Sequence, residues 1–283
     1  MIIWIASYPR SGNTWIRSLV TTHLYLDNNK SVFENIKKIT NFPNILHFKG
    51  IFEINQFTKD ELEDQKKKDK RKFEISKYWI KAQEKINRNK EITFLKTHNF
   101  GGSIEGNDFT NSNNTLGVIY IVRDPRSVAV SNAYHNNISL EQSVEDLLDE
   151  KIFATNDGNL LEFRSSWKIN YLSWKNRPYP KIIIRYEDLH FDIVNNFKKI
   201  LNFIRDFKNI SIDESKIKET INLCKIENLS KLEETIGFHE KLHNEQKFFR
   251  KGLTDEWKSK LNKNQIKKIE GSFFEEMKEL KYL

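Results

Sequence analysis

The stretch "SYPRSGNTW" at residues 7–15 decides the fold that this sequence predicts. The apolar run "IIWIAS" at 2–7 overlaps its start and indicates a buried strand, and the segment that follows indicates a helix over about 13–26. A turn with Gly and Ser between a strand and a helix directs backbone N–H groups and the positive end of the helix dipole to one point. The stretch therefore predicts an anion-binding loop.

Three further apolar runs predict strands: "ITFLKTH" at 92–98, "LGVIYIV" at 116–122 and "KIIIRYEDL" at 181–189. Helical patterns alternate with them, and this alternation predicts a mostly parallel central sheet with helices on both faces. We expect one α/β domain over residues 1–283 with three α/β/α layers. The charged segment 59–91 has no Pro or Gly and indicates a solvated helix or two. Acidic residues interrupt its basic runs, which disfavours a nucleic-acid-binding patch.

Local signals place two helix starts. Asp124 and Pro125 are typical of an N-cap and a first helical residue. Asn262 and Gln265 form a predicted capping box for a last helix.

Composition excludes several classes of protein. The 283 residues are 38% hydrophobic, which supports a globular core, and the formal charge of +8 favours anionic ligands. Cys224 is the single cysteine, so an intrachain disulfide is excluded. We find no secretion signal and no apolar segment of the ~20 residues that span a bilayer. We therefore expect a soluble, cytoplasmic protein without a membrane or nucleic-acid partner, and we leave its oligomeric state open.

Three stretches carry the chemistry. The first loop lacks the lysine of a Walker A motif, because its cation, Arg10, precedes Gly12. "RDPRSVAVS" places Arg123 at a strand end, where open α/β sheets bind ligands, and Ser131 two helical turns later. "RKGLTDEWK" at 250–258 joins two cations to a glycine. Taken singly, the second stretch fits a structural ion pair as well as an anion site, and the third fits a surface turn better than an anion site.

Together, "YPRSGNTW", "RDPRSVAVS" and "RKGLTDEWK", in this order, resemble the signature segments of cytosolic-type sulfotransferases. "FLKTH", "SSWKINYLSW" and "IIIRYEDL" extend the resemblance over most of the chain, with 27–91 the least supported part. The resemblance implies the P-loop-like sulfotransferase fold. It also implies 3′-phosphoadenosine 5′-phosphosulfate (PAPS) as donor, adenosine 3′,5′-bisphosphate (PAP) as product, a small-molecule acceptor and no metal.

The resemblance also implies roles for individual residues. The residues that match binders of the donor's 5′-phosphosulfate are Arg10, Ser11, Gly12, Asn13 and Thr14. The residues that match binders of the 3′-phosphate are Arg123, Ser131, Arg250, Lys251 and Gly252. The residues that match neighbours of adenine are Trp15, Tyr186 and Ile226.

The catalytic residues follow from the same comparison. His98 matches the catalytic histidine, which suits a general base for a hydroxyl or amine acceptor. Lys96 and Arg10 would stabilise the charge that grows on the leaving phosphate during in-line sulfuryl transfer.

The sequence departs from the family pattern at four positions. Arg10 replaces a common lysine, Asn13 a common threonine, Asp255 a usual glycine and Ile226 an aromatic residue. The alternatives are a P-loop small-molecule kinase, with Asp124 as a magnesium ligand, and a non-catalytic nucleotide-binding protein. Phe100, Phe109, Phe238 and Phe248 fit either an acceptor pocket or the core.

Overall fold

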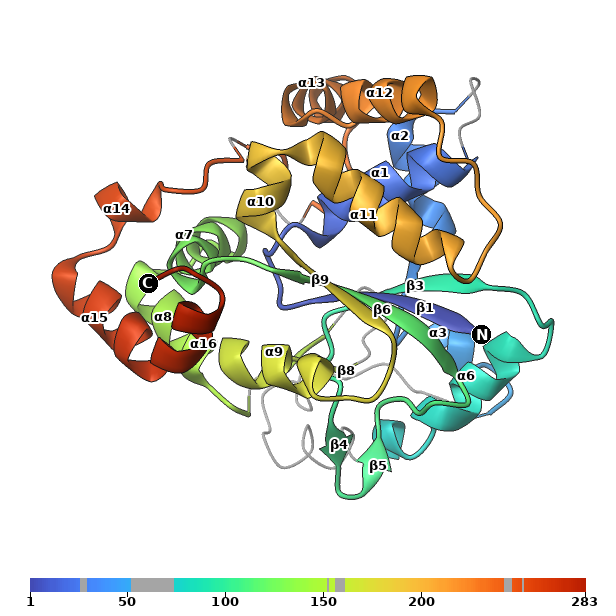
Figure 1. Cartoon of the computed structure of the whole chain (residues 1–283). Helices are drawn as coiled ribbons and strands as arrows, with labels where there is room; N and C mark the ends of the chain where they lie inside the picture. The colour runs from blue at the N-terminus through green and yellow to red at the C-terminus, as the bar shows by residue number, and fades with distance from the viewer. Residues whose placement is uncertain (26–29, 52–73, 152, 156–160, 242–245, 251) are drawn as a thin grey trace. The chain divides into compact units, whose positions relative to one another are not determined.

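The computed structural model describes all of the 283 residues except 26–29, 52–73, 152, 156–160, 242–245 and 251 (Figure 1). Contacts divide the chain into two compact units. The first unit comprises Met1–Tyr8, Thr40–Tyr120 and Asp149–Ile183, and the second comprises Pro9–Ile39, Ile121–Leu148 and Ile184–Leu283. A single domain over 1–283 stays a prediction.

The first unit carries the main sheet. Its elements are β1 (Ile2–Ser7), β2 (Thr40–Asn41), α3 (Ile45–Phe48), α6 (Trp79–Asn87), β3 (Thr93–Thr97), β4 (Ser103–Ile104), β5 (Asn107–Asp108), β6 (Thr115–Val122), β7 (Phe153–Thr155), β8 (Leu161–Phe163), α9 (Trp167–Lys175) and β9 (Lys181–Arg185). The last residues of β6 and β9 continue into the second unit.

Five strands form the sheet in the order β2-β3-β1-β6-β9. All six residues of β1 are buried, and β1 pairs in parallel with β3, with Trp4 opposite Leu95. A strand buried on both faces explains the unbroken apolar runs in the sequence. The predicted α/β class with a mostly parallel central sheet is confirmed.

The prediction for 181–189 is wrong at its end. The strand stops at Arg185, and α10 (Tyr186–Phe191) begins at the next residue. Glu187 and Asp188 occupy the first turn of this helix, where negative charge interacts favourably with the helix dipole. The predicted helix over 59–91 is confirmed at α6, whereas its residues 59–73 lie outside the described part of the chain.

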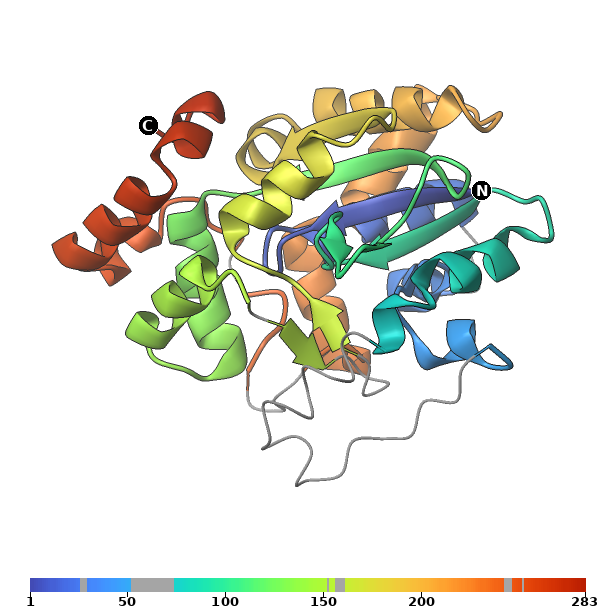
Figure 2. The same ribbon diagram turned by 90° about the horizontal axis from the view of Figure 1, so that it is seen from below.

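Aromatic side chains fill the core of the first unit. The ring of Trp4 lies 5.6 Å from that of Phe42, 5.2 Å from that of Phe109 and 6.1 Å from that of Trp174 on α9. Figure 2 shows α9 running across the strands of this sheet. Phe109 is 0% exposed and therefore belongs to the core.

The second unit is helical. Its elements are α1 (Asn13–Tyr25), α2 (Val32–Asn35), η1 (Ile36–Lys38), α7 (Pro125–Asn136), α8 (Leu140–Leu148), α10, α11 (Ile193–Arg205), α12 (Glu214–Leu223), α13 (Ile226–Ile236), α14 (Trp257–Lys260), α15 (Lys263–Ser272) and α16 (Phe274–Glu279). The predicted N-cap at Asp124 and the capping box of Asn262 and Gln265 are both confirmed. Of the helices that the structure describes, none is long and apolar enough to cross a membrane.

Candidate donor and catalytic sites

The loop between β1 and α1 combines two left-handed residues with a buried hydroxyl. Arg10 has a φ of 65° and Gly12 a φ of 98°. A Cβ at Gly12 would lie 2.6 Å from Cδ2 of Tyr186, so glycine is required there. Ser11, between them, is fully buried, and its Oγ has no hydrogen-bond partner among the described residues. A buried hydroxyl that lacks a hydrogen-bond partner and lies at a helix N-terminus is suited to donate to an oxygen of an anionic ligand.

Asn13, Thr14 and Trp15 form the first turn of α1, and all three are buried. The indole Nε1 of Trp15 donates a hydrogen bond to the carbonyl of Cys224 at 2.8 Å. The Trp15 ring also lies 5.6 Å from that of Tyr186, so these two predicted neighbours of adenine contact each other.

All three predicted anion-binding arginines lie in the second unit. Arg10 Nε donates to Ser131 Oγ at 3.2 Å, and Arg123 Nη1 donates to the carbonyl of Arg10 at 3.1 Å. Burial, followed by the positive charges of Arg123 and Arg250, lowers the pKa of Arg10 to about 10. The positive charges of these arginines repel one another, and a bound anion would relieve the repulsion. An anion is the ligand that the sequence predicts.

Tyr186 links the parts of this site. The guanidinium of Arg123 lies 4.4 Å above its ring, and its hydroxyl donates to the carbonyl of Gly252 at 3.0 Å. Burial raises the pKa of Tyr186 above its usual value. Arg123 also donates to the carbonyl of Leu253 at 2.8 Å, so Tyr186 and Arg123 both hold the segment after Arg250.

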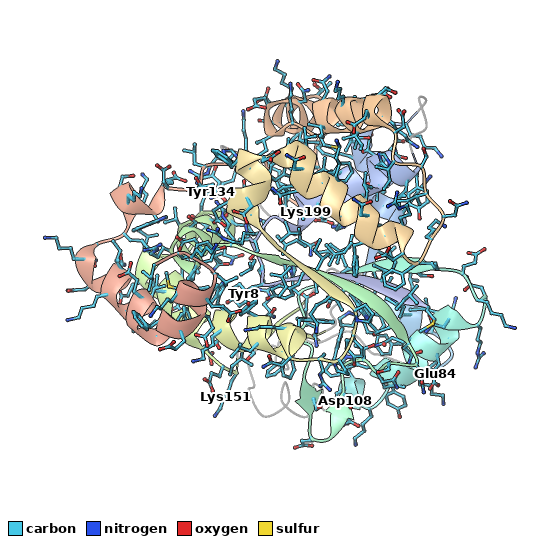
Figure 3. The ribbon with its side chains drawn as sticks, in the orientation of Figure 1. Tyr8, Glu84, Asp108, Tyr134, Lys151 and Lys199 are labelled. Atoms are coloured by element: carbon cyan, nitrogen blue, oxygen red, sulfur yellow. The ribbon has the colours of Figure 1, made fainter. Side chains whose placement is uncertain are left out.

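Arg250 lies on the same segment. Its two terminal nitrogens both donate to the carboxylate of Glu256, and its guanidinium lies 4.7 Å from the ring of Tyr134, which is labelled in Figure 3. Gly252 has a φ of 63°, and a Cβ there would lie 2.2 Å from Cδ1 of Ile226. Ile226 therefore packs directly on this glycine. Lys251 lies outside the described residues.

Glu240 contributes a contact that the sequence did not predict. Its Oε2 accepts a hydrogen bond from the Thr14 hydroxyl at 3.3 Å, and its Oε1 accepts one from Arg17 Nη1 at 2.6 Å. A carboxylate of this chain therefore contacts the hydroxyl that we expect to bind the donor.

His98 follows β3 in the first unit. Its Nδ1 lies 2.9 Å from the carbonyl oxygen of Ser7 and 3.1 Å from Ser7 Oγ. A carbonyl oxygen only accepts hydrogen bonds, so Nδ1 carries the proton and Nε2 carries the lone pair. The His98 N–H donates to Glu162 Oε1 at 3.1 Å, and its carbonyl accepts from Asn170 Nδ2 at 3.0 Å.

Lys96 lies two residues earlier in β3. It is half-buried, pairs with Ile5 across the parallel ladder, and accepts a hydrogen bond from the Phe42 N–H at 2.8 Å. Two of the three catalytic predictions, Lys96 and His98, are thus held by one strand and its end, whereas Arg10 belongs to the second unit. The predicted donor-binding residues that the structure describes belong to the second unit.

The contacts of the Asp124 carboxylate do not suit a magnesium ligand. Its Oδ1 accepts from the Arg126 N–H at 2.9 Å and its Oδ2 from Arg126 Nη2 at 2.7 Å, so the carboxylate caps α7 and pairs with arginine. Across the described residues, no group of three or more His, Cys, Asp or Glu side chains is arranged to hold a metal ion.

Sequence reasoning missed Ser7, Glu162, Glu240 and Glu187. Glu187 Oε1 accepts from the Asp124 N–H at 3.0 Å, and its Oε2 accepts from the Tyr282 hydroxyl at 2.8 Å, so it fixes the backbone next to Arg123. Burial raises the pKa of Glu187. These four residues have no sequence signal, because their partners are distant in the chain.

Comparison with known proteins identifies the family of this chain. The family model for the sulfotransferase domain matches residues 2–281. Cytosolic sulfotransferase 15 of Arabidopsis thaliana is 25% identical over 270 residues, 94% of this chain and 68% of that protein. Flavonol 3-sulfotransferase of Flaveria bidentis is 26% identical over 280 residues, 95% of this chain and 79% of that protein.

Solved structures agree on the fold. A mouse sulfotransferase complexed with PAP superposes with a TM-score of 0.58 at 20% identity, over 98% of this chain and 84% of that one. The chain therefore belongs to the sulfotransferase family and is an enzyme that transfers a sulfuryl group from PAPS.

Proposed function

We propose that His98 is the general base of this enzyme and acts through Nε2. The observation that carries the proposal is the 2.9 Å contact between His98 Nδ1 and the Ser7 carbonyl, which leaves the basic lone pair on the other nitrogen. Glu162 and Asn170 bind the backbone of His98 on both sides and limit its movement. A base held in one tautomer accepts the proton of an acceptor hydroxyl or amine without first reorienting.

The donor supplies an activated sulfuryl group. For its 5′ end we propose Arg10, the backbone around Ser11, Gly12 and Asn13, and the Thr14 hydroxyl, with Lys96 as a second cation. The buried Oγ of Ser11, which has no hydrogen-bond partner among the described residues, supports this assignment. The role of these groups is to stabilise negative charge on the leaving phosphate, for which one well-placed donor is typically worth ~3 kcal/mol.

For the 3′-phosphate we propose Arg123, Ser131, Arg250, Lys251 and Gly252. Burial lowers the pKa of Arg10 most, and the charges of Arg123 and Arg250 lower it further, so these three cations lie within electrostatic reach of one another. A cluster of cations supports an anion here. For adenine we propose Trp15 and Tyr186, whose rings are already in contact, together with Ile226.

The acceptor that we propose is a small molecule with a hydroxyl or amine group. The resemblance to cytosolic-type sulfotransferases supports this class, and one relative is named for a flavonol. We expect the protein to act in the cytoplasm, like the relative whose name says cytosolic.

The test is the pair of variants His98→Ala and His98→Gln, assayed with a panel of phenols, flavonols, aliphatic alcohols and amines. We expect turnover of any accepted compound to fall ~10²-fold or more, since general base catalysis contributes about this much. The affinity for PAP, measured by calorimetry, should be unchanged. Full turnover in either variant would remove His98 from the mechanism.

A further inference from the structure

Glu240 forms a mostly buried ion pair at the first turn of α1. Its Oε1 lies 2.6 Å from Arg17 Nη1, and the two side chains are 16% and 3% exposed. Arg17 also donates to the carbonyl of Ile39 at 2.9 Å. The second carboxylate oxygen of Glu240 accepts the hydrogen bond of Thr14.

This arrangement conflicts with donor binding at Thr14. A hydroxyl has one proton to donate, and here Glu240 accepts it. An incoming phosphate oxygen would need the same proton and would meet the negative charge of the carboxylate. The negative charge of Glu240 partly opposes the lowering of the Arg10 pKa. Glu240 therefore interacts electrostatically with a residue of the predicted 5′ site.

We infer that Glu240 sets the affinity for the donor by competing with the donor's 5′-phosphate for Thr14. This inference rests on the proposed donor site. In the free enzyme the carboxylate is the anion at Thr14 and the counter-ion of Arg17. When the donor binds, its 5′-phosphate takes the Thr14 hydrogen bond from the carboxylate.

The variant Glu240→Gln tests the competition. Glutamine keeps the side-chain length and an oxygen that accepts from Arg17, but it removes the charge. Calorimetry would compare PAP with adenosine 3′-phosphate, which lacks the 5′-phosphate. The control is Glu234→Gln, because Glu234 lies in the same part of the chain and pairs with the exposed Lys247 without contacting Thr14.

We expect Glu240→Gln to bind PAP about tenfold more tightly, from the loss of one nearby like charge. Its affinity for adenosine 3′-phosphate, and both affinities of Glu234→Gln, should equal those of the wild type. Equal PAP affinity in Glu240→Gln and wild type, or weaker binding by Glu240→Gln, would overturn the inference and leave the donor site intact. If no chain binds PAP, the proposed donor site itself fails, and this inference fails with it.

If circular dichroism shows that Glu240→Gln is misfolded, Glu240→Asp replaces it. Aspartate keeps the charge but retracts the carboxylate from Thr14, so the same selective gain for PAP is expected, with a smaller size. Its absence would overturn the inference.

Discussion

The charge of Arg10 destabilises the folded enzyme when no ligand is bound, and this effect on stability can be measured. The structure lowers its pKa to about 10, mainly through burial, which corresponds to roughly 3 kcal/mol against the charged form before solvent screening is taken into account. Because the pKa of a cation is lowered, the penalty is fully present below about pH 10 and fades as the pH rises from there toward the ordinary pKa of arginine. At neutral pH, replacement of Arg10 by a neutral residue should therefore relieve it.

The variant Arg10→Gln keeps the backbone strain at φ 65° and removes only the charge and its contacts. It loses the hydrogen bond to Ser131 and the contact of the guanidinium with the Phe248 ring at 4.9 Å, each worth about 1 kcal/mol. Arg10 is half-buried, so solvent also reduces the electrostatic term. We expect a net gain in stability of about 1 kcal/mol, equivalent to about 2–4 °C in the melting temperature of the ligand-free enzyme.

The assay is thermal unfolding in low salt, in 0.5 M salt (about 4 Å of screening length) and with saturating PAP. Salt should reduce the gain because it screens the repulsion among the arginines. PAP should raise the melting temperature of the wild type more than that of Arg10→Gln, since the variant lacks a cation for the ligand. The control Arg205→Gln removes an exposed charge and should change little. A lower melting temperature for ligand-free Arg10→Gln would refute the reasoning.

Two further substitutions probe the framework of the donor site. Gly12→Ala should lower the unfolding free energy by about 2–3 kcal/mol in urea titration and abolish PAP binding, because its Cβ meets the Tyr186 ring at φ 98°. Gly106→Ala, at φ 80° with open space around it, should lose only about 1–2 kcal/mol; equal losses would contradict the contact argument. Tyr282→Phe leaves the half-buried Glu187 carboxylate without one hydrogen bond, so we expect a loss of about 1 kcal/mol and weaker PAP binding through the backbone of Asp124. Unchanged PAP affinity in Tyr282→Phe would show that this contact does not position Arg123.

Much of the fold could be predicted because local signals determine it. The apolar runs of β1, β3 and β6 are buried strands, and Asp124 with Pro125 begins α7 as expected. The end of β9 was misplaced because an apolar run followed by Glu187 does not reveal where a strand gives way to a helix. Phe109 illustrates a different limit, since only the packing around Trp4 shows that it belongs to the core.

Part of the candidate site could likewise be predicted from the sequence, and part could not. The arginines and glycines could be found because they fall in recognisable motifs. The contacts of Ser7 with His98, of Glu162 with His98 and of Thr14 with Glu240 join residues that are 91, 64 and 226 positions apart. Such pairs are created by the tertiary fold, and no local pattern in the sequence marks them.

The central claim is that this enzyme binds a nucleotide with phosphates at both the 3′ and 5′ positions. The most direct test is calorimetric titration with PAP, ADP and ATP, each with magnesium and with a chelator. We predict tight binding of PAP that does not depend on magnesium, and much weaker binding of ADP and ATP. Binding of ATP with magnesium, and none of PAP, would contradict the account.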